Sequence, residues 1–365
     1  MSLKVDCMKL KDFGWTYNVH RFALNEQSVA QLREKAAADD PEACYMYGRY
    51  HYCVRPEPNS VSQALELYKK ALSGGVADAN VAIAIMWSEG DMGIADLERY
   101  NDIIDDMMER GCDFAFLRRL LDMIVGKNGI DKDAEKAAEI IEMLFEERDE
   151  DNALWYYLMG RALMECQNNE AAATWFEKAV AAGFLDANCY LVLTKCLDAD
   201  CDLKVDENHY MELLNDAYAK GDGLAAYMLA SLLVDRFDEV EDSLRAEFRD
   251  HLLRTAIYGY RAGYGCAATL IGDICINGSC DLEYDLYEAW MWYAKGALFG
   301  DAEAFEKLYK MATSDLHPME DELFEQLAID GARQGSETLK AEVVKLYRNG
   351  RLQHYAKEIE ALYME

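Results

Sequence analysis

The chain has 365 residues, of which 68 are acidic and 37 are basic, so its formal net charge is −31. This charge repels nucleic-acid phosphates and anionic lipids, which excludes both as favoured partners. An apolar fraction of 52% with only 4 prolines excludes a disordered acidic chain. The longest apolar run, Val81 to Trp87, is far shorter than the roughly 20 residues of a bilayer span, so we expect no membrane insertion.

The N-terminal residues lack the apolar core of a secretory signal, and the 11 cysteines are an odd number. Both features argue against a secreted disulfide framework and favour a cytoplasmic protein with reduced, mostly buried thiols. Residues 1–25 carry Phe13, Trp15, Tyr17 and Phe22 and fit no repeat. They are expected to pack either on the first repeat or on another chain, and the leading Met-Ser-Leu is either native or an added leader.

Residues 28–38 predict a helix that caps the N-terminal end of a repeat array. After it, a Gly followed four residues later by an Ala recurs about every 36 residues. The copies are Gly75/Ala79, Gly111/Ala115, Gly183/Ala187, Gly221/Ala225, Gly263/Ala267 and Gly300/Ala304. With Ala as the first residue, the repeats start at 43, 79, 115, about 152, 187, 225, 267 and 304.

Each repeat predicts two helices, because apolar residues recur at helical spacing on both sides of a Gly-rich joint. Gly48, Gly160 and Gly272 fall inside first helices, where glycine costs about 1 kcal/mol in helix propensity. A close crossing by the second helix is expected to offset that cost.

The helix ends carry their own signals. Gly75, Gly183 and Gly300 follow second helices, where a left-handed cap favours glycine. Asp133 and Asp285 stand at expected N-caps. No alternating apolar pattern of useful length occurs, so we expect no sheet.

The third repeat shows the full pattern: Leu120-x-x-Met123-x-x-Gly126, Gly129-Ile130, then Asp133-x-x-Lys136-Ala137-x-x-Ile140-Ile141. About eight copies of this pattern, over residues 40–350, resemble the Sel-one-like repeat (SLR) family, a relative of the tetratricopeptide repeats. The chain departs from the family by a two-residue turn between the joint glycines, by Arg148 at a terminal glycine position and by Arg55–Pro58 in the first joint.

The resemblance implies an all-α, right-handed solenoid of helix-turn-helix repeats with a concave inner face. The predicted organisation is an N-terminal segment and capping helix (1–41), a solenoid of about eight repeats (42–350) and a C-terminal capping helix (351–365), with the last helix starting near Gln353. Family members commonly serve as scaffolds or adaptors, and a catalytic role is not typical of them.

In related helix-pair repeats the first helix lines the concave groove, so residues offset from the core positions of first helices are the candidate protein-binding residues. They are Tyr45, Arg49, Tyr52, Ile85, Tyr157, Arg161, Glu165, Tyr227, Asp273 and Asn277. Tyr and Arg are enriched in binding hot spots. The alternative is that the tyrosines fill space between helices and that Arg49 and Arg161 pair with internal carboxylates, which we favour slightly for the arginines.

Other constellations favour structural explanations. Cys189, Cys196 and Cys201 near His209 lack the usual zinc spacing, and Asp198-x-Asp200-x-Asp202 lacks the Gly and Glu of a calcium loop. The acidic runs 146–151 and 238–242 favour solvated turns over docking edges for a basic protein. Cys44 and His51 lack an orienting third group for nucleophilic catalysis.

The sequence therefore predicts a non-enzymatic scaffold without a cofactor or metal, binding a protein or peptide, with a basic partner favoured by the charge. A self-assembling structural protein is the main alternative. A small-ligand-binding protein or a hydrolase with a groove pocket is a weaker one. The oligomeric state, monomer or homodimer, stays open.

Overall fold

The computed structural model describes residues 26–54, 59–91, 95–147, 153–185, 187–196, 205–314 and 321–363. All regular structure in these ranges is helical, which confirms the prediction of an all-α chain without sheet. None of the described helices is both long and apolar enough to cross a membrane. The aromatic segment 1–25, the Arg55–Pro58 joint and Arg148 lie outside the described residues.

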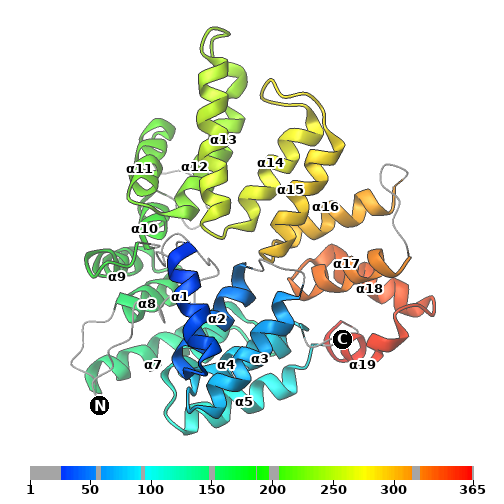
Figure 1. Cartoon of the computed structure of the whole chain (residues 1–365). Coiled ribbons are helices and arrows are strands. Elements are labelled where there is room, and N and C mark those ends of the chain that lie inside the picture. Colours follow the sequence, from blue (N-terminus) through cyan, green and yellow to red (C-terminus); the bar gives the residue numbers. More distant parts are fainter. Residues whose placement is uncertain are drawn as a thin grey trace. The chain divides into compact units, whose positions relative to one another are not determined.

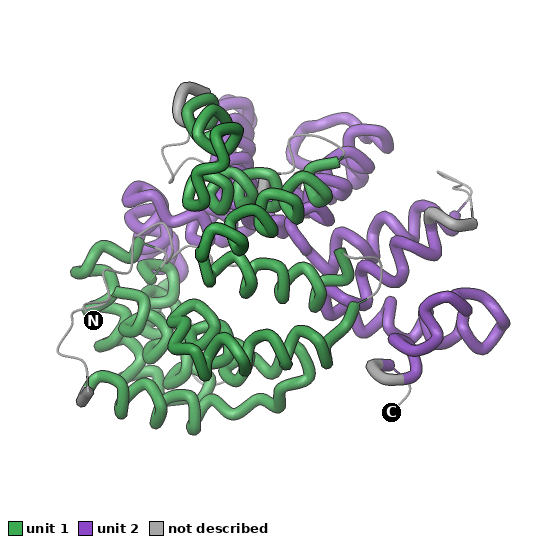
Figure 2. The backbone as a smooth tube through the Cα atoms, turned by 60° about the horizontal axis from the view of Figure 1, so that its bottom comes forward, with its two compact units in different colours: residues 1–206 green, residues 207–365 purple. Residues whose placement is uncertain are grey.

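The chain divides into two compact units, which Figure 2 colours separately. Unit 1 is residues 1–206, and in it each described helix packs against the next one in sequence (Figure 1). Its helices are α1 (Glu26–Ala37), α2 (Pro41–Val54), α3 (Ser60–Ser73), α4 (Asp78–Ser88), α5 (Leu97–Glu109), α6 (Asp113–Val125), α7 (Ala134–Glu147), α8 (Ala153–Glu165), α9 (Asn169–Ala181) and α10 (Ala187–Cys196).

Unit 2 is residues 207–365, and within it each α-helix likewise packs against the next one in sequence. Its α-helices are α11 (Glu207–Ala219), α12 (Gly223–Asp235), α13 (Arg245–Arg261), α14 (Gly265–Asn277), α15 (Leu286–Leu298), α16 (Ala302–Ala312), α17 (Asp321–Arg333), α18 (Glu337–Arg348) and α19 (Ala356–Leu362). Short 3-10 turns, η2 (Phe237–Glu239) and η3 (Gln353–Tyr355), precede α13 and α19.

The helices alternate as the repeat predicts. The first helices of the repeats are the even-numbered ones from α2 to α16, and the second helices are the odd-numbered ones from α3 to α17. First helices of successive repeats also contact each other, as α4 does α6 and α14 does α16. This translational succession is that of an α-solenoid, and it confirms the predicted fold class. The boundary between the two compact units falls inside the fifth repeat, between α10 and α11.

Helix ends follow the sequence signals. Asp285 is the N-cap of α15 and accepts a hydrogen bond from the backbone N–H of Glu288 at 2.9 Å. Asp133 does the same for Lys136 at the start of α7, at 3.0 Å. Gly75 and Gly183, which follow second helices, have φ values of +94° and +90°, a conformation that side chains disfavour.

The glycines inside first helices permit a close crossing by an aromatic ring. A Cβ added at Gly160 would lie 2.6 Å from Phe176 of α9, and one at Gly272 would lie 2.6 Å from Tyr293 of α15. Phe176 and Tyr293 are fully buried. The crossing distance therefore depends on glycine at these positions, as the sequence predicts.

The two ends of the array are closed by short helices. α1 packs on α2, and the Cys44 thiol of α2 donates to the Ala36 carbonyl at 3.5 Å. At the other end, the buried guanidinium of Arg333 makes a two-pronged ion pair with the buried Glu358 of α19, at 2.9 and 3.0 Å. The helices predicted near 28–38 and after Gln353 are thus present as α1 and α19.

Candidate protein-binding faces

Two of the predicted groove residues in unit 1 form a buried cluster on α8. The Arg161 guanidinium donates to the Tyr157 hydroxyl at 3.2 Å and to the Tyr190 hydroxyl of α10 at 3.1 Å. It also lies over the Tyr190 ring and 3.9 Å from Glu165. The partners of Arg161 are therefore the phenols of Tyr157 and Tyr190 and, at a longer distance, the carboxylate of Glu165. All three belong to the same chain, as the alternative of internal pairing expects.

A related arrangement occupies α2. Tyr45 and Arg49 are both 1% exposed, and the Arg49 guanidinium lies 5.8 Å from the centre of the Tyr45 ring. The burial of Tyr45, Arg49, Tyr157 and Arg161 corrects the expectation that these side chains line an open surface. They fill the space between helices, because the adjacent glycines bring the second helix close to this side of the first helix.

The other predicted groove residues retain exposed surface. Tyr52 and Ile85 are half-buried, and the Tyr52 hydroxyl donates to Asp91 at 2.7 Å. Glu165 is half-buried and pairs with Lys132 at 2.7 Å. In unit 2, Tyr227 and Asp273 are half-buried, and Asn277 is exposed. A role of these residues in binding stays a prediction.

Asp273 is the centre of a polar cluster on the first helices of unit 2. It accepts from the Tyr293 hydroxyl at 2.7 Å and from the Lys307 ammonium of α16 at 2.8 Å. Lys307 also pairs with Glu303 at 3.3 Å. This cluster links α14, α15 and α16 and leaves more carboxylates than cations on that face.

Nearby, burial raises the pKa of Tyr227 and of Cys266, each to about 12, with the charges of Asp301 and Glu303 acting in the same direction. Both groups are therefore neutral at physiological pH. A neutral Cys266 thiol is a poor nucleophile.

A surface that the sequence analysis missed lies on the second helices of unit 1. On α5, four carboxylates follow one another at intervals of four, three and four residues, and on α7 three more occupy the equivalent repeat positions, all exposed. Residues at this spacing share one helix face. We call the set the acidic ladder, and it consists of Glu98, Asp102, Asp105, Glu109, Glu135, Glu139 and Glu142. These carboxylates recur at helical spacing and are not consecutive in sequence, so they do not form an acidic run like 146–151 or 238–242.

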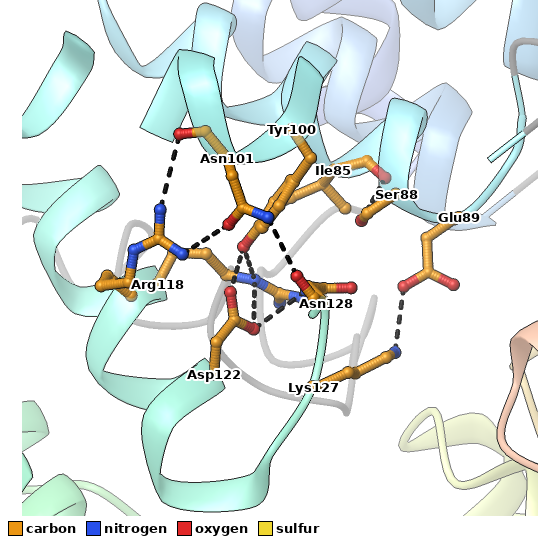
Figure 3. A network of polar contacts seen from close by, with 10 residues as sticks. Ile85, Ser88, Glu89, Tyr100, Asn101, Arg118, Asp122, Lys127 and Asn128 are labelled. Atoms are coloured by element: carbon orange, nitrogen blue, oxygen red, sulfur yellow. Dashed lines mark hydrogen bonds and ion pairs between the residues drawn. The ribbon is translucent and has the colours of Figure 1, made fainter. Parts of the chain in front are cut away.

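A buried polar network holds α5, which carries four of the seven ladder carboxylates, on α6 (Figure 3). The Tyr100 hydroxyl donates to Asp122, which also accepts from the Asn128 amide at 2.9 Å. Arg118 donates to the Tyr100 oxygen at 3.1 Å and lies 3.5 Å from Asp122. Burial raises the pKa of Asp122, and the charge of Arg118 with the hydrogen bonds of Tyr100 and Asn128 opposes that shift.

The next arginine reaches outward from the same helix. Arg119 donates to the Asn101 side chain at 2.6 Å and to Asp105 of the ladder, also at 2.6 Å. Asn101 in turn donates to the Asn128 carbonyl at 3.1 Å. The network therefore fixes the position of a ladder carboxylate as well as that of its helix.

The metal candidates gain no support. No group of three or more potential ligands occurs among the residues that the structure describes. Cys189 and Cys196 are buried on α10, and His209 lies in the exposed first turn of α11. Cys201 lies outside the described residues, as do Asp198, Asp200 and Asp202. The run 238–242 is mostly exposed around η2, and most of the run 146–151 is not described.

Alkylation should rank the described thiols by exposure and charge. Burial raises the pKa of Cys112 to about 11 and of Cys266 to about 12, so at pH 8 almost none of either is thiolate. Cys166 is exposed. We expect iodoacetamide to modify Cys166 of the native protein at least about tenfold faster than the other two, measured by peptide mass spectrometry. Equal rates would contradict this, and the urea-unfolded protein is the control.

Comparison with known proteins gave similarity of fold only. No family model matches the chain, and no curated protein matches it. Among solved structures, a protective antigen of uropathogenic Escherichia coli that displays an SLR fold is 16% identical, over 91% of this chain and 69% of that one, with a TM-score of 0.37. A Sel1 repeat protein from Oxalobacter formigenes is 18% identical, over 87% of this chain and 90% of that one, with a TM-score of 0.42. These two structures are what the chain is similar to, and its helix-pair repeat architecture follows from its own succession of packed helices.

Proposed function

We propose that this protein is a non-enzymatic scaffold that binds a basic segment of another protein. The observation that carries the proposal is the acidic ladder, because it places exposed carboxylates at matching positions of two successive repeats. Helix-pair repeats create extended surfaces of this kind. A net charge of −31 adds long-range attraction for a cationic partner and predicts fast, salt-sensitive association.

The groove side of the first helices is the second element of the proposal. Tyr227, Asp273 and Asn277 keep exposed surface in unit 2, and the polar cluster around Asp273 adds negative charge. We propose that a bound segment contacts these residues by hydrogen bonds and ion pairs. The free thiols Cys44, Cys112 and Cys266 fit a reducing compartment, so we place the protein in the cytoplasm.

The test is titration of the full chain with a lysine-rich amphipathic peptide at several salt concentrations. The ladder variant carries Glu98→Gln, Asp102→Asn, Glu135→Gln and Glu139→Gln. The matched control carries Glu170→Gln, Glu241→Gln, Glu247→Gln and Glu283→Gln, which removes the same charge from exposed carboxylates outside the ladder. We expect the ladder variant to bind at least about tenfold more weakly than the protein itself and the control to lose no more than about threefold.

The salt dependence gives a second readout. Because screening acts on exposed charges, the dissociation constant of the unmodified protein should rise steeply with salt, and that of the ladder variant should rise less. If the two variants lose the same affinity for the peptide, net charge alone explains the binding, and the acidic ladder is not the binding site. A photo-crosslinker placed at Asn277 and, separately, at Asp102 then shows whether the peptide lies on the groove side or on the ladder.

A further inference from the structure

The outer face of α15 carries an apolar stripe where other repeats are polar. Tyr287, Met291 and Leu298 are 69%, 38% and 55% exposed, and Ala294 lies between the last two on the same face. We call these four residues the α15 seam. Tyr284, 57% exposed, extends it beyond the start of the helix.

The equivalent positions of other second helices show that the α15 seam is a local specialisation. On α3 these positions hold Ser62, Glu66, Lys69 and Ser73, and on α5 they hold the carboxylates of the acidic ladder. On α9 they hold Glu170, Thr174, Glu177 and Ala181. Contact between apolar side chains and water is unfavourable, so a state in which the α15 seam is covered is favoured.

The spacing within the seam is that of a coiled coil. Tyr287, Met291, Ala294 and Leu298 follow at intervals of four, three and four residues, which are the a and d positions of a heptad. A second helix therefore fits along the seam. Glu288 and Lys295 each follow a d position, so they flank the seam on one side, seven residues apart.

We propose that the α15 seam is a self-association surface, on which α15 of a second copy packs antiparallel about a two-fold axis. In this register Met291 lies opposite Ala294 of the second copy, and Tyr287 lies opposite Leu298 of the second copy. Large side chains then meet smaller ones at each layer, as close packing requires.

The flanking charges select a second copy as the occupant. In the same register Glu288 of one copy and Lys295 of the other lie on the same side of the seam. They are offset by two residues, or about 3 Å along the axis. Each α15 thus carries both members of the ion pair, and the two-fold axis forms the pair twice. A helix pair of this length is a small interface, so the dimer is weak and forms at high local concentration.

The experiment is sedimentation equilibrium of the full chain over a wide concentration range, with salt near 0.15 M to screen the repulsion between acidic chains. We expect a reversible monomer–dimer equilibrium. Met291→Lys should abolish dimers. Glu288→Lys and Lys295→Glu should each raise the dissociation constant at least about tenfold, because each places like charges opposite one another at both ends of the seam.

The double variant Glu288→Lys, Lys295→Glu restores opposite charges across the axis and should recover the dissociation constant to within about threefold. Lys69→Glu on α3 is the matched control and should leave dimerisation unchanged. A helical far-ultraviolet spectrum and an unchanged melting temperature show that each variant is folded. A monomer at all concentrations, or a double variant that associates no better than the single ones, would overturn the proposal.

Discussion

Replacing Gly160 by alanine is expected to destabilise unit 1 by about 1–3 kcal/mol, the usual cost of overpacking a filled core. Helix propensity alone predicts the opposite sign, since alanine is favoured over glycine in a helix interior by about 1 kcal/mol. The added Cβ would lie 2.6 Å from the ring of Phe176, a fully buried side chain that α9 cannot easily move. The sign of the change in the free energy of unfolding therefore shows whether the close helix crossing or helix propensity determines the stability of the Gly160→Ala variant.

The free energy of unfolding is measured by urea denaturation, with hydrogen exchange of peptides from α8 and α9 to assign the loss to unit 1, because two units need not unfold in one transition. Phe176→Leu alone removes buried apolar volume and should also destabilise. The double variant Gly160→Ala, Phe176→Leu should be more stable than the sum of the two losses predicts, since the smaller side chain makes room for the methyl group. A stabilising Gly160→Ala variant would show that the crossing relaxes at no cost.

Replacing Asp122 by alanine should have the larger effect, a loss of about 3–5 kcal/mol, because it leaves the charge of Arg118 buried without its carboxylate. The Asp122 side chain is 1% exposed and that of Arg118 is 7% exposed. Alanine also removes the acceptor of the Tyr100 hydroxyl and of the Asn128 amide. Unsatisfied buried donors carry their own desolvation cost.

The control is the paired variant Arg118→Met, Asp122→Leu, which replaces both charges by apolar groups of similar size. Such replacements are often neutral, so this variant should be considerably more stable than Asp122→Ala. Thermal and urea unfolding check the stability, and hydrogen exchange of α5 shows whether the ladder helix loosens. If the paired variant is as unstable as Asp122→Ala, the hydrogen bonds of the network, rather than the buried charge, carry the stability.

The acidic ladder connects this network to the proposed function. Since Arg119 positions Asp105 while Tyr100 and Asn101 tie α5 to α6 and to the turn at Asn128, loosening the network should also weaken peptide binding. A salt titration of a folded network variant therefore separates loss of ladder geometry from loss of ladder charge, because its net charge is unchanged when both Arg118 and Asp122 are replaced.

The sequence alone determines the repeat, because each unit needs the same few residues at the same spacing. Glycine is favoured after second helices, where φ is positive. Asp285 and Asp133 fix the starts of their helices as N-caps. The sequence also records how closely the helices cross. In the fourth repeat Gly160 faces the large ring of Phe176. In the second repeat the corresponding pair is Ala84 and the smaller Ile104. Size compensation of this kind is visible in a one-dimensional pattern because the repeats are in phase.

Only the tertiary structure decided which side chains have surface to offer. Tyr45 and Arg161 stand at positions that a helix-pair repeat would expose, but the close crossing at the neighbouring glycine buries them. The residues of the acidic ladder and the α15 seam were not expected to bind a partner, and only their exposure in the structure identifies them as surfaces. The exposure of a side chain depends on which other helices cover its face of the helix, so the residue pattern within one helix does not contain it.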